Sequence, residues 1–215
     1  MGHNVAELVR LMLVTDDRMT AGRDLVGLAL SAERGGVTSL QLRLKQATPR
    51  ELAEAVRALI RALRIPLLVN DRPDVAIAAG AAGVHLGPDD LPVSLARRIG
   101  PPGFVIGASV GSEQEAAAGT SADYWGIGPW RGTGTKSDAG AALGAAGFAR
   151  LLDLAGDKPC IAIGGVTPND VPLVLRAGGK GVAVVSGILA ARDVEAAARR
   201  YARAGSRAEG QQGSN

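Results

Sequence analysis

Eight short apolar segments, separated by stretches with helical periodicity, constrain the fold of this chain most. They span residues 11–15, 39–44, 66–70, 83–87, 105–109, 124–128, 160–164 and 181–186. Runs of this length, rich in Val, Ile, Leu and Ala, are typical of strands buried on both faces of a parallel sheet. The chain is therefore expected to alternate strands with helices.

The clearest helical stretch covers residues 50–64. One face of it carries Leu52, Val56, Leu59, Ile60 and Leu63. A start signal precedes it, because Thr48 suits the cap, Pro49 the first helical position and Glu51 the third position of a capping box. Residues 112–115 and 167–170 predict two further helix starts.

Eight strand–helix repeats in a chain of 215 residues predict an α/β fold with a single (β/α)8 TIM barrel. The alternative is a doubly wound open sheet, which carries phosphate-binding glycines after its first strand. Here Asp16, Asp17 and Arg18 follow the first segment, so the barrel is favoured. We expect residues 1–204 to form one catalytic domain and residues 205–215 to form a disordered polar tail.

The composition of the chain argues against nucleic-acid binding, a disulfide framework and a membrane span. The net charge is +3, and no dense Lys/Arg block with interleaved aromatic residues is present, so anionic small molecules are favoured over nucleic acid. The single cysteine, Cys160, excludes a disulfide framework within the chain and favours a reducing, cytoplasmic location. No apolar run approaches the roughly 18 to 20 residues needed to span a bilayer, so no membrane partner is expected. The sequence leaves open whether the chain forms a homo-oligomer.

In a barrel of this kind, the carboxyl ends of the strands and the loops after them form the active face. Gln41, Arg43 and Lys45 alternate with leucines at the end of the second segment. Side chains two residues apart on a strand share a face, about 7 Å apart. If the leucines face the helices, the two cations and the amide face the barrel mouth and require an anionic partner. Ion pairs with nearby carboxylates are the structural alternative.

Carboxylates follow the next two segments. Asn70 and Asp71 end the third, and Asp89 and Asp90 follow the fourth. Mg²⁺ takes one or two protein carboxylates and completes its shell with phosphate oxygens and water, so these loops predict a magnesium site. Alternatively, Asp71 pairs with Arg72, or one of the later aspartates caps the next helix.

The remaining strand ends offer hydroxyl groups and backbone amides. Ser109 ends the fifth segment, and the loop after the sixth carries Thr133, Thr135 and Lys136 among glycines. The seventh and eighth segments end in Gly164–Gly165 and in Val185–Ser186–Gly187, with a helix expected to begin near Ile188. Bare amides at these two loops form the usual phosphate site of this barrel class. His85 lies mid-segment and is predicted to be a hydrogen-bonded core histidine rather than a base.

Two anion sites, one of them with a metal, would thus face each other across one barrel mouth. Such an arrangement suits two phosphorylated small-molecule substrates that are joined while pyrophosphate leaves one of them. The sequence offers no Ser/His/Asp or Cys/His set for nucleophilic catalysis.

Taken together, these residues resemble the thiamine-phosphate synthase family over residues 11–199. The resemblance is carried, in chain order, by Gln41-Leu42-Arg43-Leu44-Lys45, Asn70-Asp71-Arg72, Gly83-Val84-His85-Leu86-Gly87 with Asp90, Thr133-Gly134-Thr135-Lys136, Ile163-Gly164-Gly165 and Val184-Val185-Ser186. Six motifs in the right order make the resemblance specific, although each alone is weak.

The resemblance implies a transferase that joins 4-amino-2-methyl-5-hydroxymethylpyrimidine diphosphate to hydroxyethylthiazole phosphate, or to its carboxylate form. The products would be thiamine monophosphate and pyrophosphate, formed by Mg²⁺-assisted dissociative loss of pyrophosphate. The residues that would hold the pyrimidine diphosphate are Gln41, Arg43, Lys45, Asn70, Ser109 and Lys136, of which Arg43, Lys45 and Lys136 would be catalytic. Asp71 and Asp90 would bind Mg²⁺. The thiazole phosphate would contact Thr133, Thr135, Gly165, Val185 and Ser186.

The chain departs from the family pattern at three places. Pro88 stands where Gln is usual, Gly111 where His is frequent, and Arg131–Gly132 where an aromatic residue and a proline are usual. Two other functions are open to a chain of this kind. A thiazole tautomerase-like barrel would not need the diphosphate clamp with two metal aspartates, and a non-catalytic sensor of thiamine precursors would be expected to carry an extra interaction module.

Overall fold

The computed structural model describes residues 3–132 and 141–212, and within them the predicted barrel is confirmed. Eight parallel strands pair in chain order, and the eighth closes on the first. The strands are β1 (Leu11–Val14), β2 (Ser39–Leu42), β3 (Leu67–Asn70), β4 (Gly83–Leu86), β5 (Val105–Val110), β6 (Tyr124–Ile127), β7 (Cys160–Ile163) and β8 (Gly181–Val184). The first and last residues of each strand lie within two residues of the predicted bounds. The prediction succeeds because strands buried on both faces are apolar along their whole length.

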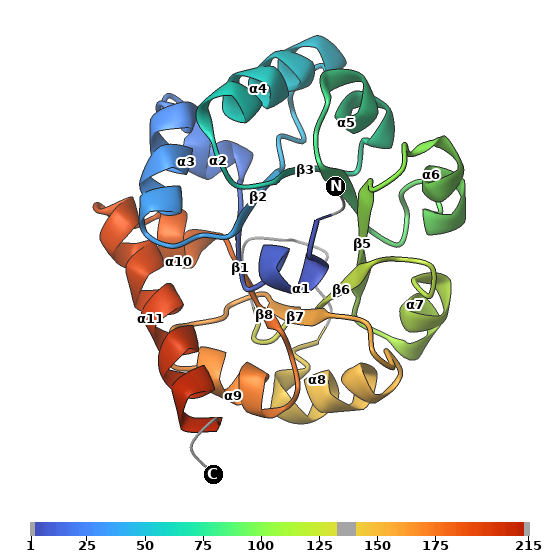
Figure 1. Cartoon of the computed structure of the whole chain (residues 1–215), viewed down its shortest axis with the longest axis vertical. Coiled ribbons are helices and arrows are strands. Elements are labelled where there is room, and N and C mark those ends of the chain that lie inside the picture. The colour runs from blue at the N-terminus through green and yellow to red at the C-terminus, as the bar shows by residue number, and fades with distance from the viewer. Residues whose placement is uncertain (1–2, 133–140, 213–215) are drawn as a thin grey trace.

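Most of the helices surround the barrel in the order of the chain, and the first lies across its end, as Figure 1 shows in a view along the barrel. They are α1 (Val5–Leu8), α2 (Asp17–Thr20), α3 (Leu25–Arg34), α4 (Pro49–Ala62), α5 (Pro73–Ala79), α6 (Val93–Ile99), α7 (Glu113–Ala118), α8 (Gly144–Asp153), α9 (Val171–Arg176), α10 (Ser186–Leu189) and α11 (Val194–Gln212). None of the helices in the described ranges is both long enough and apolar enough to cross a membrane.

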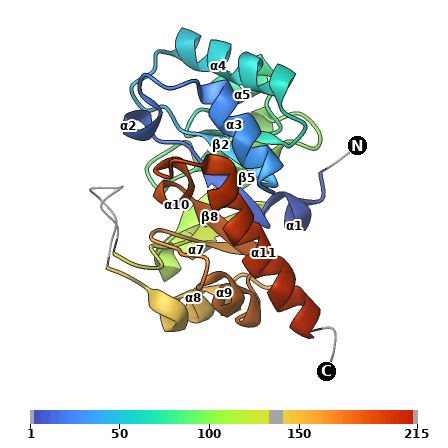
Figure 2. The same cartoon turned by 90° about the vertical axis from the view of Figure 1, so that its left-hand side faces the viewer.

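The two ends of the barrel are different. Helix α1 lies at the amino-terminal ends of the strands, whereas the short helices α2 and α10 lie at the opposite end (Figure 2). The hydroxyl of Ser39 donates to the carbonyl of Leu8 at 2.7 Å and so ties α1 to the barrel. The open end is therefore the carboxyl end of the strands, where active sites of this fold occur.

The core forms two layers, as expected when successive strand residues point to opposite faces. In β1, Leu11 and Leu13 pack outward against the helices, and Met12 and Val14 point into the barrel. The interior layer consists of Leu8, Val9, Met12, Val14, Leu68, Val105, Tyr124, Ile161 and Ala183. This filled interior confines ligand binding to the open end.

Two of the three predicted helix starts are confirmed. Thr48 and Glu51 form the reciprocal capping box of α4, and the side chain of Ser112 accepts from the amide of Glu115 at the start of α7. The third is displaced, because α9 begins only at Val171. The carboxylate of Asp170 accepts hydrogen bonds from both the amide and the hydroxyl of Thr167, which holds this stretch as a turn.

The predicted tail from residue 205 is wrong for residues 205–212, which continue α11 to Gln212. Tyr201, Ala204 and Ala208 recur at helical spacing; Tyr201 and Ala204 belong to or pack on the core, and Ala208 is buried. The composition of the segment suggested that it could bury little, but alanines at helical spacing are sufficient to anchor it. The barrel domain thus extends beyond residue 204.

Substituting Gly107 with Ala should lower the free energy of unfolding by about 1–3 kcal/mol, the range for overpacked cores. A Cβ at this position of β5 would lie 2.2 Å from Cζ of the buried Tyr124 ring. The matched control is Gly132→Ala, since a Cβ there meets no atom within 4 Å. Urea denaturation of both variants measures the effect, and equal stability would show that the barrel interior is looser than described.

Candidate active site

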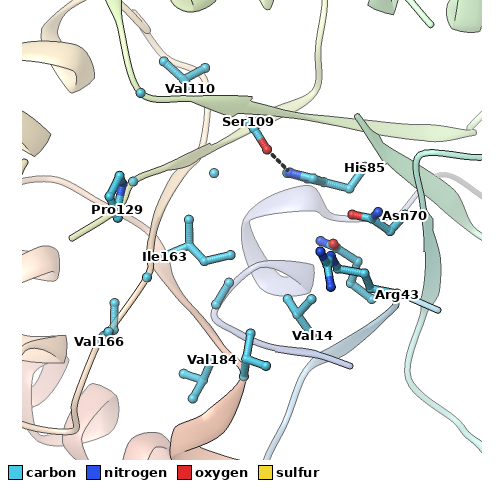
Figure 3. Close-up of a pocket in the computed structure, with 18 of the residues that line it drawn as sticks. Val14, Arg43, Asn70, His85, Ser109, Val110, Pro129, Ile163, Val166 and Val184 are labelled. Carbon is cyan, nitrogen blue, oxygen red and sulfur yellow. Dashed lines mark hydrogen bonds between the residues drawn. The ribbon is translucent and has the colours of Figure 1, made fainter. Parts of the chain in front are cut away.

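A cavity of about 530 Å³ opens at the carboxyl ends of the strands, and all eight strands or the residues directly after them contribute to its lining. One side is polar and includes Asp16, Gln41, Arg43, Asn70, His85 and Ser109. The other side is formed by apolar side chains and glycines after β6, β7 and β8. Figure 3 shows Arg43, Asn70 and His85 on one side of this space and Pro129, Ile163 and Val166 on the other.

Hydrogen bonds hold the backbone of Arg43, whereas its guanidinium lacks hydrogen-bond partners for some of its donors. Its amide donates to the Thr15 hydroxyl at 2.7 Å, and that hydroxyl lies 3.1 Å from the Arg43 carbonyl oxygen. Nη1 lies 3.4 Å from Oδ2 of Asp16, which is long for a hydrogen bond. Across the described part of the chain, Arg43 Nε is the only buried side-chain nitrogen or oxygen without a hydrogen-bond partner. Arg43 also lines the cavity, so a small turn of its side chain would bring this unsatisfied donor to an anion there.

Lys45, Asp71 and Asp90 form a second charged cluster beside Arg43. Lys45 Nζ lies 2.8 Å from Oδ2 of Asp71, and the side chains of Asp71 and Asp90 share a hydrogen bond. Asp71 adopts a φ of 65°, a left-handed conformation that Asp tolerates better than most residues. Its amide donates to the carbonyl of His85 at 2.9 Å, which attaches this turn to β4.

The two carboxylates of this cluster differ in pKa because they are close and partly buried. Burial, followed by the hydrogen bond with Asp71, raises the pKa of Asp90 to about 6. For Asp71, burial alone would raise the pKa, but hydrogen bonds with Asp90 and Lys45 and the nearby charge of Arg43 outweigh it and lower the pKa. The pair therefore holds one proton near neutral pH more readily than an isolated aspartate would.

The same pair is chemically suited to a hard divalent cation. A cation would replace the shared proton and relieve the repulsion between the two carboxylates. The parts of the chain that the structure describes contain no group of three or more His, Cys, Asp and Glu side chains placed to hold a metal. A cation at Asp71 and Asp90 would therefore complete its shell with substrate oxygens and water, which is the usual coordination of Mg²⁺.

The positions of the predicted polar residues differ in detail from the expectation. Gln41 and Arg43 both line the cavity. Lys45, Asp71 and Asp90 do not, but Asn70 and Pro88, their close neighbours in the chain, do. The charged cluster therefore lies at the rim. Lys45 pairs with Asp71 outside the cavity lining. β2 already ends at Leu42, so the regular alternation predicted from Gln41 does not extend to Lys45.

Ser109 and His85 belong to a hydrogen-bonded chain that reaches into the barrel core. His85 Nε2 lies 3.0 Å from Ser109 Oγ, and His85 Nδ1 lies 2.8 Å from the hydroxyl of Tyr124. The Tyr124 hydroxyl also interacts with the side chain of Gln41, and its burial raises the pKa of Tyr124 strongly. The prediction of a hydrogen-bonded histidine is confirmed, but His85 also lines the cavity, so its role is not confined to the core.

The opposite side of the cavity presents backbone groups. Gly165, Val185 and Ser186, all predicted phosphate contacts, line it together with Gly164 and Gly187. Gly164 and Gly165 adopt φ values of 90° and 67°, which favour glycine. Helix α10 begins at Ser186, two residues earlier than expected, so the amides of its first turn lie at this edge.

Three predicted contacts, Thr133, Thr135 and Lys136, lie outside the described residues. Of the other predicted residues, Gln41, Arg43, Asn70, Ser109, Gly165, Val185 and Ser186 come together around one cavity, with Lys45, Asp71 and Asp90 at its rim. Sequence reasoning missed Asp16, the ion-pair partner of Arg43, although its position directly after a strand could have marked it. Trp130 is buried against Phe148, with ring centroids 5.6 Å apart, and has a packing role.

Comparison with known proteins agrees with this arrangement. A sequence model of the family described as thiamine monophosphate synthase matches residues 11–188. Over 194 residues the chain is 51% identical to a thiamine-phosphate synthase of Azorhizobium caulinodans, covering 88% of this chain and 91% of that protein. The thiamine-phosphate synthase of Methanoculleus marisnigri is 48% identical over 194 residues, covering 88% and 92%.

A solved structure gives the same result in three dimensions. The thiamine phosphate pyrophosphorylase from Pyrococcus furiosus superposes with a TM-score of 0.84 and 33% sequence identity, covering 95% of this chain and 99% of that one. Because the family match, the relatives and the solved structure all extend over most of the barrel, the chain belongs to the thiamine monophosphate synthase family, whose members are transferases of thiamine biosynthesis.

Proposed function

We propose that this enzyme joins 4-amino-2-methyl-5-hydroxymethylpyrimidine diphosphate to hydroxyethylthiazole phosphate and releases pyrophosphate and thiamine monophosphate. With the carboxylate form of the thiazole phosphate, carbon dioxide would leave as well. The observation that carries the proposal is the buried, unpartnered Nε of Arg43 beside the Asp71–Asp90 pair. Leaving a buried cationic donor without a hydrogen bond costs about 1–3 kcal/mol or more. An anionic ligand in the cavity would satisfy this donor once the Arg43 side chain turns toward the ligand.

The polar side of the cavity would bind the diphosphate of the pyrimidine substrate. Arg43 would donate from its guanidinium, and Lys45 at the rim would exchange part of its ion pair with Asp71 for a phosphate oxygen. Asn70 and Ser109 would add neutral hydrogen bonds, with the hydroxyl of Ser109 oriented by His85. Lys136, for which the role rests on sequence alone, would contribute a further cation.

Asp71 and Asp90 would hold Mg²⁺, which when bound supplies positive charge next to the departing diphosphate. Charge develops on the leaving group as the carbon–oxygen bond of the pyrimidine substrate breaks. Arg43 and Lys45 would stabilise that charge, which is electrostatic catalysis without a protein nucleophile. The carbon that loses pyrophosphate becomes a cation, and the amino group of the pyrimidine ring stabilises this cation by donating electrons through the ring.

The opposite side of the cavity would position the second substrate. Amides near Gly165 and at the start of α10, with the Ser186 hydroxyl, would bind the thiazole phosphate. Thr133 and Thr135 are proposed to assist on the strength of the sequence motif. The thiazole nitrogen would then lie close to the pyrimidine carbon and form the new carbon–nitrogen bond with little further loss of entropy.

Incubating the enzyme with both phosphorylated substrates and Mg²⁺ should release pyrophosphate and thiamine monophosphate in equal amounts. Removing the metal with a chelator should abolish turnover, and adding excess Mg²⁺ should restore it. Coupled pyrophosphate detection together with chromatography of the product measures both quantities.

Two other outcomes would assign a different function. Tight binding of the substrates without turnover would indicate a sensor of thiamine precursors. Conversion of a thiazole carboxylate phosphate to an isomer, with no use of the pyrimidine diphosphate, would indicate a tautomerase. Either result would refute the proposed condensation.

A further inference from the structure

Asp170 is a buried carboxylate outside the charged clusters described above. Its side chain is only 1% exposed, yet it carries no role in the proposed chemistry. Arg131 Nη2 donates to Oδ1 at 2.6 Å and Nη1 donates to Oδ2, so the pair is bidentate. The amide and hydroxyl of Thr167 donate to Oδ2 at 2.8 and 2.6 Å. Four hydrogen bonds thus hold this carboxylate, two from Arg131 and two from Thr167.

The ion pair joins two loops at the open end of the barrel. Arg131 follows β6, whereas Asp170 ends the loop of residues 164–170 between β7 and α9. Backbone bonds connect the same two loops, since the Trp130 amide donates to the Ile163 carbonyl at 2.7 Å and the Arg131 amide donates to the Gly164 carbonyl at 2.9 Å. A Cβ on Gly165 would lie 2.9 Å from Cβ of Arg131, so the loops are in direct contact.

The geometry argues against direct contact between Arg131 and a ligand in the cavity. Gly164, Gly165 and Val166 line the cavity, whereas Arg131 and Asp170 do not. Both terminal nitrogens of the Arg131 guanidinium are engaged by Asp170. The effect of Arg131 on binding must therefore pass through the loop that Asp170 anchors.

We propose that Arg131 is a positioning residue that acts through Asp170 to hold the amides near Gly165 in place for the phosphate of the thiazole substrate. This role rests on the proposed function. Fixed amides bind a phosphate well only when their directions are set before the ligand arrives. The planar fork of Arg matches a carboxylate at two points, which the single ammonium of Lys cannot reproduce. Arg131 occupies one of the positions where the chain departs from the family pattern.

The test compares Arg131→Ala and Arg131→Lys with Arg97→Ala as the matched control. Arg97 also forms an Arg–Asp pair, with Asp123 at 2.7 Å, and is 40% exposed against 51% for Arg131. Its pair lies before β5 and β6, at the opposite end of the barrel. Arg131→Ala should raise KM for hydroxyethylthiazole phosphate about tenfold, the effect typical of residues that orient a ligand-binding group. KM for the pyrimidine diphosphate and kcat should change less than about twofold, and Arg131→Lys should restore little of the loss.

Calorimetric binding of hydroxyethylthiazole phosphate to the same variants separates this inference from the proposed function, because it needs no turnover. A weaker Kd in both Arg131 variants but not in Arg97→Ala supports the positioning role even if the wild-type enzyme proves inactive in the condensation. An unchanged Kd and KM in Arg131→Ala, with only the loss of stability also seen in Arg97→Ala, would overturn it while leaving the condensation intact. Absence of binding to the wild-type enzyme would refute both.

Discussion

Replacing Arg43 with Ala should lower kcat by about 100- to 1,000-fold, the usual cost of removing one donor to charge that develops in a transition state. The free energy of unfolding should change by less than about 1 kcal/mol, because loss of the long Asp16 ion pair is offset by removal of the unsatisfied Nε. The backbone contacts of Arg43 with Thr15 do not depend on the side chain, and Asp16 keeps its hydrogen bonds from the amides of Arg18 and Met19. Steady-state kinetics and urea denaturation of the same preparation measure both quantities.

Two variants make this experiment specific. Arg43→Lys keeps the charge but removes Nε, and so should recover only part of the rate. Arg72→Ala removes an exposed cation, paired with Asp74, that lies one residue from Asp71. It should leave kcat nearly unchanged. If Arg43→Ala lost stability in proportion to its rate, or retained near-normal kcat, Arg43 would be structural and the proposed clamp would be wrong.

Replacing Asp71 with Asn should lower kcat by about 100-fold or more, because a metal ion supplies several kcal/mol of stabilisation to the departing charge. Stability should fall by less than about 1 kcal/mol, because the ion pair that Asp71 forms with Lys45 is partly exposed. Asp74→Asn is the matched control, because Asp74 is an exposed carboxylate in the next turn of the chain and pairs with Arg72. A loss of rate in both variants, or unfolding of Asp71→Asn, would contradict the assignment.

Titration of the same variants with Mg²⁺ at several pH values adds a second readout. Metal binds the deprotonated carboxylates, and the pKa of Asp90 is raised to about 6. The apparent affinity of the wild-type enzyme for Mg²⁺ should therefore be highest above pH 7 and fall as the pH drops through about 6, approaching tenfold per pH unit. In Asp71→Asn the affinity should be low at every pH. Affinity that rises on acidification would contradict the assignment of these ligands.

The fold was predictable because its signals are local. Each barrel strand is a short apolar run. The start of α4 is determined by three neighbouring residues, Thr48, Pro49 and Glu51. The two errors arose from contacts between segments or faces. The turn before α9 depends on Asp170, which Arg131 holds from another loop, and the end of α11 depends on the burial of Ala208. Propensity describes a segment alone, so it misses stabilisation that comes from packing.

The sequence predicted which strand-end residues lie at the candidate site, but it did not predict the hydrogen bonds and ion pairs among them. The barrel topology alone brings Gln41, Arg43, Asn70 and Ser109 to one cavity. The partners of these residues could not be read from the sequence, because they depend on geometry across strands. Asp16 contacts Arg43 from 27 positions away, and Asp170 contacts Arg131 from 39. The shared hydrogen bond of Asp71 and Asp90, which makes them a candidate cation site, likewise required the three-dimensional arrangement.

A crystal structure of the enzyme with Mg²⁺, pyrophosphate and thiamine monophosphate tests most directly whether one cavity performs the whole reaction. Pyrophosphate should accept a hydrogen bond from the guanidinium of Arg43, the metal should lie between Asp71 and Asp90, and the phosphate of the product should contact the amides near Gly165. A pyrophosphate bound away from Arg43, or a metal held by other residues, would contradict the account.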